Sequence, residues 1–107
     1  MIIELMSDEL EYLYDTDIDE MEGKQSFSKD IIKQYKRKVD ILVQIEKLSE
    51  LNNYSSLNFE KLKSDLKGYY SIRLNKQYRL IFRVEKTEKN EISIQIIQVT
   101  EISKHYE

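Results

Sequence analysis

Apolar residues at the start of the chain predict a strand followed by a short helix. The run at residues 2–6 is apolar and partly β-branched, which is typical of a strand. Ser7 then offers a helix cap, and residues 8–14 follow a helical period. The apolar positions on one face of that segment are Leu10, Leu13 and Tyr14. The periodicity is lost over residues 15–26, where we expect a loop.

The longest helical pattern begins after the loop. Ser28 is a second cap, and apolar residues recur at helical spacing from there to about Leu48. These positions are Ile31, Ile32, Tyr35, Val39, Leu42, Val43 and Ile45. A second, long amphipathic helix is therefore expected, ending before the polar loop at residues 52–56.

The hydrophobic period changes to two in the last third of the chain, after a compact segment at residues 57–68. Alternation of this kind predicts three consecutive strands, with loops near residues 75–76 and 86–90. The alternating sets are Tyr70, Ile72 and Leu74, then Leu80, Phe82 and Val84, then Ile92, Ile94 and Ile96. We expect one α+β domain over residues 1–107, with two N-terminal helices packed on a small, mostly antiparallel sheet in the order β-α-α-β-β-β.

Side-chain parity fixes the register of the first hairpin. A two-residue turn would place Arg79 opposite Ile72 on the core face, which is physically poor. An odd loop over residues 75–77 instead pairs Ile72 with Leu80 and Tyr70 with Phe82. The odd loop is the better prediction because it matches apolar residues with one another.

The odd loop has a consequence on the other face of the hairpin. Arg73 then stands opposite Arg79, and Tyr69 stands opposite Arg83. Like charges in cross-strand pairs are mildly destabilising unless an anion such as phosphate lies between them. The alternative is that both guanidinium groups extend into water, where screening makes their repulsion small.

The charge of the chain is divided unevenly along its length. Residues 1–22 hold nine acids and no Lys or Arg, whereas all seventeen Lys and Arg lie in residues 23–107 beside eleven acids. A basic body is a weak indication of a polyanionic partner. The acids of residues 15–20, namely Asp15, Asp17, Asp19 and Glu20, form either a simple solvated loop or an electrostatic brake on the approach to such a partner.

The composition of the chain excludes some kinds of site and argues against others. The chain has no cysteine, so disulfides and thiolate metal sites are excluded. Its first residues lack the pattern of an export signal, and no stretch is suited to span a membrane, so we expect a cytoplasmic protein without a membrane partner. The single histidine has no metal-ligand spacing around it, and no phosphate-binding glycine loop is present, which argues against metal-dependent hydrolysis.

Two further clusters carry candidate chemistry. The segment at residues 103–107 places His105 beside Tyr106 just after the last strand, with Lys104 before it. A histidine can titrate near neutral pH, although a lone terminal histidine is more often incidental. Glu60 and Lys63 precede the hairpin, and they offer a proton acceptor and a cation if a phosphate lies nearby.

The motifs at residues 56–63, 68–82 and 102–106 together resemble the RelE/ParE superfamily of toxins. Toxins of the HigB type are the nearest members. The resemblance covers residues 28–107 well, and the expected first strand and helix fit the opening of the family fold. The acidic segment between them is poorly matched.

The resemblance implies an enzyme, an endoribonuclease or mRNA interferase that cuts mRNA on the ribosome, inhibits translation and arrests growth. It implies a cognate helix-turn-helix antitoxin of the HigA type, contact with operator DNA only through that antitoxin, and no cofactor. The catalytic positions carried over are Arg79, Arg73, His105, Lys63 and Glu60. The expected RNA-binding positions are Tyr106, Lys104, Arg83, Tyr69 and Lys76.

The resemblance also leaves alternatives. Ser71 stands where some relatives have a lysine, so the basic cluster is thinner and cleavage of RNA without a ribosome is not expected. A non-nuclease toxin similar to ParE, acting on DNA gyrase, is the main rival. A third reading is an inactive module that serves chiefly to bind an antitoxin.

Overall fold

The computed structural model describes residues 1–104, with the side chain of Lys89 excepted. Two helices, α1 (Asp8–Asp15) and α2 (Lys29–Gln44), precede most of the sheet. The five strands are β1 (Ile2–Leu5), β2 (Glu60–Lys61), β3 (Tyr69–Arg73), β4 (Tyr78–Lys89) and β5 (Ile92–Lys104).

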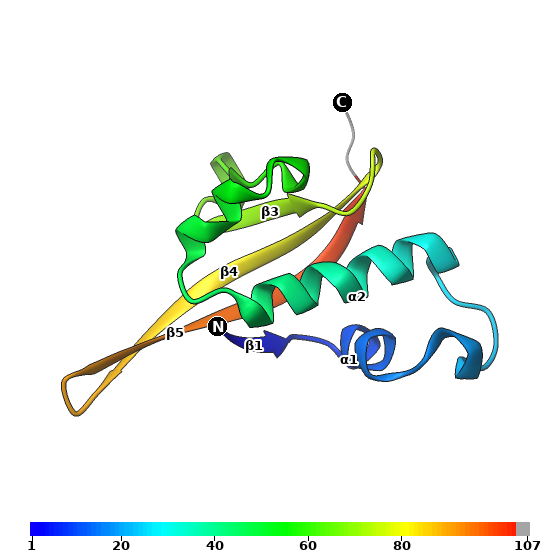
Figure 1. The fold of residues 1–107 in the computed structure, drawn as a ribbon, viewed down its shortest axis with the longest axis horizontal. Helices are drawn as coiled ribbons and strands as arrows, with labels where there is room; N and C mark the ends of the chain where they lie inside the picture. Colours follow the sequence, from blue (N-terminus) through cyan, green and yellow to red (C-terminus); the bar gives the residue numbers. More distant parts are fainter. Residues whose placement is uncertain (105–107) are drawn as a thin grey trace.

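The strands form one sheet in the order β1-β5-β4-β3-β2. Strand β1 runs parallel to β5, and the other neighbours are antiparallel. Helix α2 crosses one face of this sheet, and α1 lies beside it near the end of β1 (Figure 1). The expected α+β fold is confirmed, and the face of the sheet opposite α2 has no α-helix over it; we call it the open face.

Local sequence signals explain the two helices. The Ser7 hydroxyl accepts the backbone N–H of Leu10 at the start of α1, and Ser28 does the same for Ile31 at the start of α2. The Lys36 ammonium of α2 donates to three carbonyls at the end of α1, those of Leu13, Tyr14 and Thr16. A cation on the carbonyl end of a helix satisfies unpaired acceptors and the helix dipole, so Lys36 fixes α1 against α2.

The core lies between α2 and the covered face of the sheet. Its most deeply buried members come from both layers, and the exposed fraction of each is 1% or less. They are Leu13, Ile32, Tyr35, Val39, Leu42, Leu51, Leu57, Ile72, Leu80, Phe82, Ile97 and Val99. The hydroxyl of buried Tyr35 is satisfied, because it donates a hydrogen bond to the Leu10 carbonyl at 2.9 Å.

The first hairpin has the predicted register. Tyr70 faces Phe82, Ile72 faces Leu80 and Arg73 faces Arg79 across β3 and β4. Asn75 closes the loop by accepting the backbone N–H groups of Gln77 and Tyr78 through its side-chain oxygen. The three-residue loop therefore keeps the arginines on the open face.

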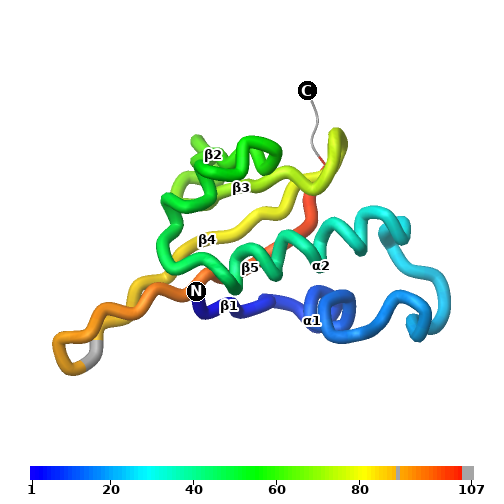
Figure 2. Tube along the Cα trace, in the orientation of Figure 1, coloured from blue at the N-terminus to red at the C-terminus, as the bar shows by residue number. Residues whose placement is uncertain are grey.

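The second hairpin is longer than the sequence predicts. Residues 86–89, expected in a loop, continue β4, and the turn is reduced to Asn90 and Glu91 with φ of 53° and 65°. Two positive φ angles are typical of a type I′ turn, whose twist matches that of the strands. The β4–β5 hairpin consequently projects beyond the helices (Figure 2). The alternating set Ile92, Ile94 and Ile96 lies on the face opposite the core, because the core residues of β5 before its irregularity are Ile97 and Val99, and Ile92 is 62% exposed.

Other differences concern the middle of the chain. Helix α2 ends at Gln44 and not near Leu48, and the expected loop at residues 52–56 is largely made of 3₁₀ turns, Leu48–Asn53 and Ser55–Leu57. Strand β2 has only two residues and no alternating pattern, so it was not predicted. The expected loop at residues 15–26 includes a 3₁₀ turn, Ile18–Glu20, whose Ile18 packs against the core.

A β-bulge interrupts the pairing of β4 with β5. Ile81 faces Glu101 whereas its neighbour Phe82 faces Val99, so Thr100 is the extra residue. The Thr100 hydroxyl donates to the Ile81 carbonyl at 3.2 Å. The bulge changes side-chain parity along β5, which puts Val99 in the core and Ser103 on the open face.

Within residues 1–104, no helix has the length and apolar character needed to cross a lipid bilayer.

Candidate functional site

A small cavity opens on the uncovered face of the sheet, where β2, β3, β4 and β5 lie side by side. Its volume is about 250 Å³. The polar side chains that line it are Glu60, Ser71, Arg79, Ser103 and Lys104, and the apolar ones are Leu62, Leu66 and Ile81. We call this the arginine cavity.

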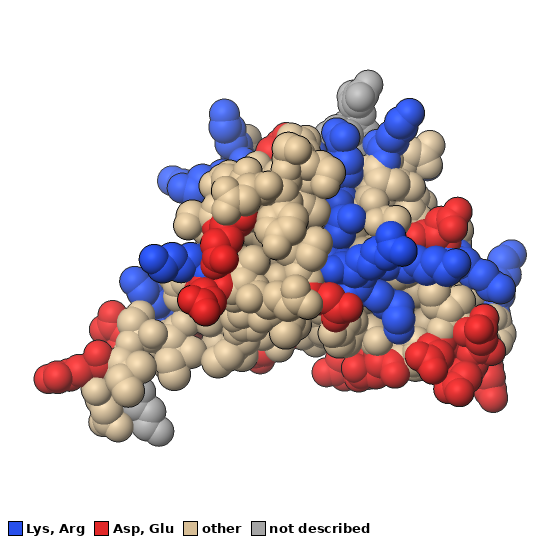
Figure 3. All heavy atoms as spheres, viewed as in Figure 1, with Lys and Arg blue, Asp and Glu red and all other residues tan. Residues whose placement is uncertain are grey.

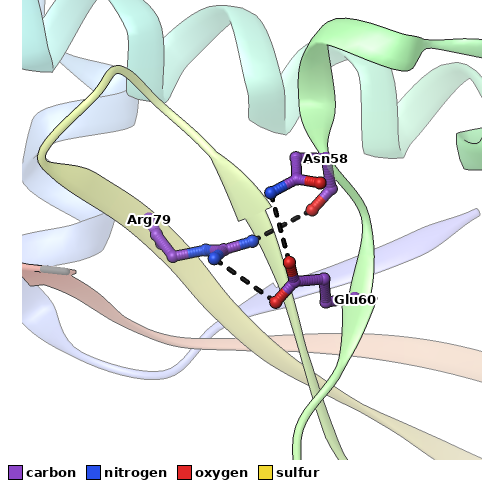
Figure 4. A network of polar contacts seen from close by, with 3 residues as sticks. All are labelled: Asn58, Glu60 and Arg79. Carbon is purple, nitrogen blue, oxygen red and sulfur yellow. Dashed lines mark hydrogen bonds and ion pairs between the residues drawn. The ribbon is translucent and has the colours of Figure 1, made fainter. Parts of the chain in front are cut away.

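Arg79 is the centre of this cavity. The residue is only 9% exposed, an unusual degree of burial for a charged side chain. One terminal nitrogen, Nη2, donates to the Asn58 carbonyl at 2.9 Å, and Nη1 lies 3.4 Å from Oε2 of Glu60 (Figure 4). The Asn58 amide in turn donates to the other Glu60 oxygen at 3.2 Å. Glu60 and Asn58 thus hold the guanidinium group in one orientation.

Two polar atoms in the arginine cavity are buried without a partner. They are Nε of Arg79 and the hydroxyl oxygen of Ser71, and neither makes a hydrogen bond to any of the described residues. Buried polar groups in native proteins are nearly always satisfied, so an unsatisfied pair in a cavity indicates a place for a polar ligand.

Arg73 adds a second positive charge next to Arg79. It faces Arg79 across β3 and β4, and its side chain is exposed. Ser103 of β5 faces Arg79 from the other side. The two guanidinium groups thus occupy neighbouring positions on one face of the sheet, and an anion bound there would offset their repulsion.

Arg83 belongs to a separate polar row on the same face. It donates through Nε to Gln98 at 2.6 Å and through Nη1 to the Tyr69 hydroxyl at 3.1 Å, and Gln98 donates to Glu4 at 3.1 Å. This row crosses β3, β4, β5 and β1. Arg83 therefore already has protein partners, and its structural role is to tie the strands below the arginine cavity.

The remaining predicted site residues are divided among several places. Lys104 lines the arginine cavity, whereas Lys63 lines a neighbouring hollow that shares only Leu62 with it. Lys76 is exposed in the β3–β4 loop, away from both linings. His105 and Tyr106 lie outside the described residues.

Sequence reasoning missed three contributors to the cavity. The place of Ser71 on the open face could have been inferred, since the predicted register puts it opposite Ile81. The place of Ser103 depends on the bulge in β5, which the sequence does not reveal. Asn58 contributes through its backbone carbonyl in a left-handed conformation with φ of 45°, which no side-chain pattern reveals. The part of the chain that the structure describes has no cluster of three or more His, Cys, Asp or Glu able to hold a metal ion.

Comparison with solved structures defines the class of the fold. The chain is similar to a YoeB/ParE toxin from Agrobacterium tumefaciens with a TM-score of 0.53 at 20% sequence identity, and the match covers 99% of this chain and all of the other. The fold is thus that of the RelE/ParE toxins.

Sequence comparison gives the family. Residues 4–96 match the HigB-like toxins, described as RelE-like toxins of type II toxin-antitoxin systems, and the chain belongs to this family. It is 49% identical over 47 residues to Toxin HigB-1 of Vibrio cholerae, and 38% identical over 56 residues to an uncharacterised protein of Haemophilus influenzae. These matches cover 44% and 52% of this chain, and they span 50% and 55% of the relatives.

Proposed function

We propose that this protein is the toxin of a type II toxin–antitoxin system and that it cuts mRNA on the ribosome in the cytoplasm. Family membership supports the first part. The observation that carries the second is Arg79, a nearly buried cation whose Nε is unsatisfied in a cavity that also holds a carboxylate. Preorganised donors of this kind stabilise charge that develops in a transition state.

The proposed reaction uses the RNA as its own nucleophile. The ribose 2′-oxygen forms a bond to the adjacent phosphorus, and the bond from phosphorus to the 5′-oxygen of the next nucleotide breaks. The 2′-hydroxyl gives its proton to a base, and the leaving oxygen takes a proton from an acid. The products are a 2′,3′-cyclic phosphate and a 5′-hydroxyl, and the step consumes no water.

The arginine cavity and the exposed Arg73 beside it supply charge stabilisation and one proton acceptor for this reaction. Arg79 and Arg73 stabilise the additional negative charge on the phosphate oxygens. Glu60, 46% exposed at its side chain and adjacent to Arg79, is positioned to accept the 2′ proton. His105 is the second candidate for proton transfer. Lys104 lines the same cavity and contributes to RNA binding.

The Glu60–Arg79 ion pair gives the site a defined resting state. A phosphate that binds Arg79 competes with Glu60 for Nη1, because both are anionic acceptors of the same donor. Substrate binding in this proposal therefore releases the carboxylate at the moment when a base is needed. The hydrogen bond from Arg79 to the Asn58 carbonyl keeps the guanidinium in place during the exchange.

Mapping of transcript ends after brief induction tests the proposal. The chain with Arg79→Gln is compared with Arg37→Gln, a matched loss of one positive charge on the exposed surface of α2. Loss of one preorganised donor costs about 10²–10³ in rate, so Arg79→Gln should remove cuts within translated frames and restore growth. Arg37→Gln should cut as the parent does.

The same experiment separates the proposal from its rival. Intact transcripts together with DNA damage would favour an action on DNA gyrase and would overturn the nuclease. Intact transcripts without growth arrest would favour a module that only binds an antitoxin. The partner expected for any of these is an antitoxin encoded with the toxin, of the helix-turn-helix HigA type.

A further inference from the structure

A second hollow lies next to the arginine cavity, and its volume is about 720 Å³. It is formed by β2, the start of β3 and the loop between them, and it shares Leu62 with the arginine cavity. Its size falls within the usual range of ligand sites. Two backbone hydrogen bonds, from Leu66 to Lys63 and from Lys67 to Ser64, fold the loop into compact turns. We call this second feature the lysine hollow.

The lysine hollow concentrates positive charge without compensation. Three lysines line it, Lys61, Lys63 and Lys67, and no Asp or Glu does. All three side chains are exposed, and within residues 1–104 none of them makes an ion pair or a side-chain hydrogen bond. In Figure 3, Lys and Arg lie at the upper left, where β2 is, and also along α2, whereas Asp and Glu gather over α1 and the segment after it. Such an uncompensated basic cluster is the electrostatic signature of a phosphate-bearing ligand.

The wall of the lysine hollow is suited to a nucleobase. Its apolar and aromatic members are Leu62, Tyr69 and Tyr70. The Tyr69 ring is held in place, because its hydroxyl accepts a hydrogen bond from Arg83 and the Arg83 guanidinium lies 5.9 Å from the ring centroid. A fixed aromatic ring beside lysines is the usual arrangement for a nucleotide of single-stranded RNA, whose base stacks while its phosphate is neutralised.

We propose that the lysine hollow binds the nucleotide next to the cleaved linkage, with Lys61 and Lys67 on its phosphate and Tyr69 beside its base. The inference rests on the proposed function, because it assumes that RNA occupies the arginine cavity. It also changes the role of Lys63, which lines the lysine hollow and not the arginine cavity: Lys63 binds the flanking nucleotide and leaves the cleaved phosphate to the arginines. The toxin then contacts two successive phosphodiester linkages of one RNA strand.

A combination of protein and RNA changes tests this contact directly. The mRNA carries a neutral methylphosphonate at one of the two linkages that flank the cleaved one, and programmed ribosomes present it to the toxin. The protein variant is Lys61→Gln with Lys67→Gln, and the control is Lys33→Gln with Lys86→Gln, a matched loss of two exposed lysines outside both cavities. Single-turnover cleavage gives the toxin concentration for half-maximal rate.

With the parent toxin, the neutral linkage on the bound side should raise that concentration about tenfold, the effect of losing one charge-assisted hydrogen bond. The Lys61 and Lys67 variant should need about tenfold more toxin on unmodified mRNA and should show no further effect of the neutral linkage. The control variant should respond to the linkage as the parent does. Each mRNA is compared across proteins, so any effect of the linkage on ribosome occupancy cancels.

Different failures have different meanings. Suppose that, at both flanking positions, the neutral linkage raises the half-maximal toxin concentration of the variant by the same factor as that of the parent. The lysines then do not contact the flanking phosphates, and the lysine hollow is not a nucleotide site. An unchanged half-maximal concentration for the variant, or a loss of antitoxin binding alone, overturns it equally. If the parent toxin fails to cut unmodified mRNA on ribosomes, the proposed function itself is refuted and the flanking contact with it.

Discussion

Replacing Arg79 with methionine should abolish cleavage without destabilising the fold. Arg79 is 9% exposed and makes two contacts, one with the Asn58 carbonyl and one with Glu60. Loss of a residue this deeply placed ordinarily lowers the free energy of unfolding. Here the removed group is a desolvated charge with an unsatisfied Nε, so its removal also removes a cost.

The magnitudes of the lost and relieved interactions predict that Arg79→Met leaves the free energy of unfolding unchanged or raises it. The ion pair with half-exposed Glu60 is worth about 0–1 kcal/mol, and the hydrogen bond to the Asn58 carbonyl about 1.5–3 kcal/mol. Against these, an unsatisfied buried donor costs about 1–3 kcal/mol, and burial of the charge adds several kcal/mol. We expect Arg79→Met to range from no change to about 2 kcal/mol more stable, and each kcal/mol raises Tm by about 4–8 °C in a domain of this size.

The converse substitution removes the carboxylate of Glu60 and keeps the charge of Arg79. Glu60→Gln leaves the guanidinium of Arg79 without its carboxylate, which should lower the free energy of unfolding by about 1 kcal/mol. The same substitution made in the Arg79→Met background should have almost no effect, because the charge that needed a partner is gone. The coupling between the two substitutions isolates the ion pair.

Urea unfolding followed by circular dichroism measures these differences on the purified proteins. Leu80→Ala is the matched control, since Leu80 is the next residue of β4, is fully buried on the other face and should lose about 2–5 kcal/mol. If Arg79→Met lowers the free energy of unfolding by as much as Leu80→Ala does, Arg79 is a structural residue. The argument that its burial serves a ligand would then be refuted.

Three further predictions concern other parts of the chain. Tyr35→Phe, which leaves the buried Leu10 carbonyl without its donor, should lower the free energy of unfolding by about 1–3 kcal/mol in urea titrations, and an unchanged value would mean that water replaces the hydroxyl. The hydrogen bond to Asp40 raises the pKa of Tyr14 from 10.0 to about 12, so this contact stabilises the fold below pH 10 and its contribution is lost as the pH rises toward 12. Asp40→Asn should move that pKa back toward 10.0 in an ultraviolet titration, and a value that stays near 12 would assign the shift to burial. Replacing the four acids of residues 15–20 with Asn or Gln should tighten ribosome association most at low ionic strength, whereas equal affinity across a salt series with an equal thermal melt would make that segment a spacer.

Periodicity was sufficient for the elements that pack on the core. Caps at Ser7 and Ser28 and the apolar spacing after each of them identify both helices, because a helix buries one stripe of side chains and the sequence repeats that stripe. Parity gave the register of β3 and β4, since a shift of one residue would bury Arg79 among apolar side chains.

Features set by tertiary pairing were not predictable in this way. The alternation of Ile92, Ile94 and Ile96 does not mark the core face, because the core residues of β5 in that region are Ile97 and Val99. Strand β2 is too short to have a period, and its place beside β3 is what brings Glu60 to Arg79. The arginine pair of the site followed from local sequence. Glu60 was a candidate proton acceptor from the sequence, but its contact with Arg79 depends on a long-range strand pairing that local patterns do not reveal.

The bulge at Thr100 gives β5 one position where a residue can be lost without changing the site. Substitutions of Thr100 lose at most one hydroxyl contact, with the Ile81 carbonyl. Deletion of the same residue would restore a regular ladder, because Val99 and Glu101 would then be consecutive opposite Phe82 and Ile81, and Ile102 and Ser103 would keep their partners and their faces. A residue inserted after Ile102 would instead turn Ser103 toward the core, so natural variation in length is expected at Thr100 and not in the residues that follow it.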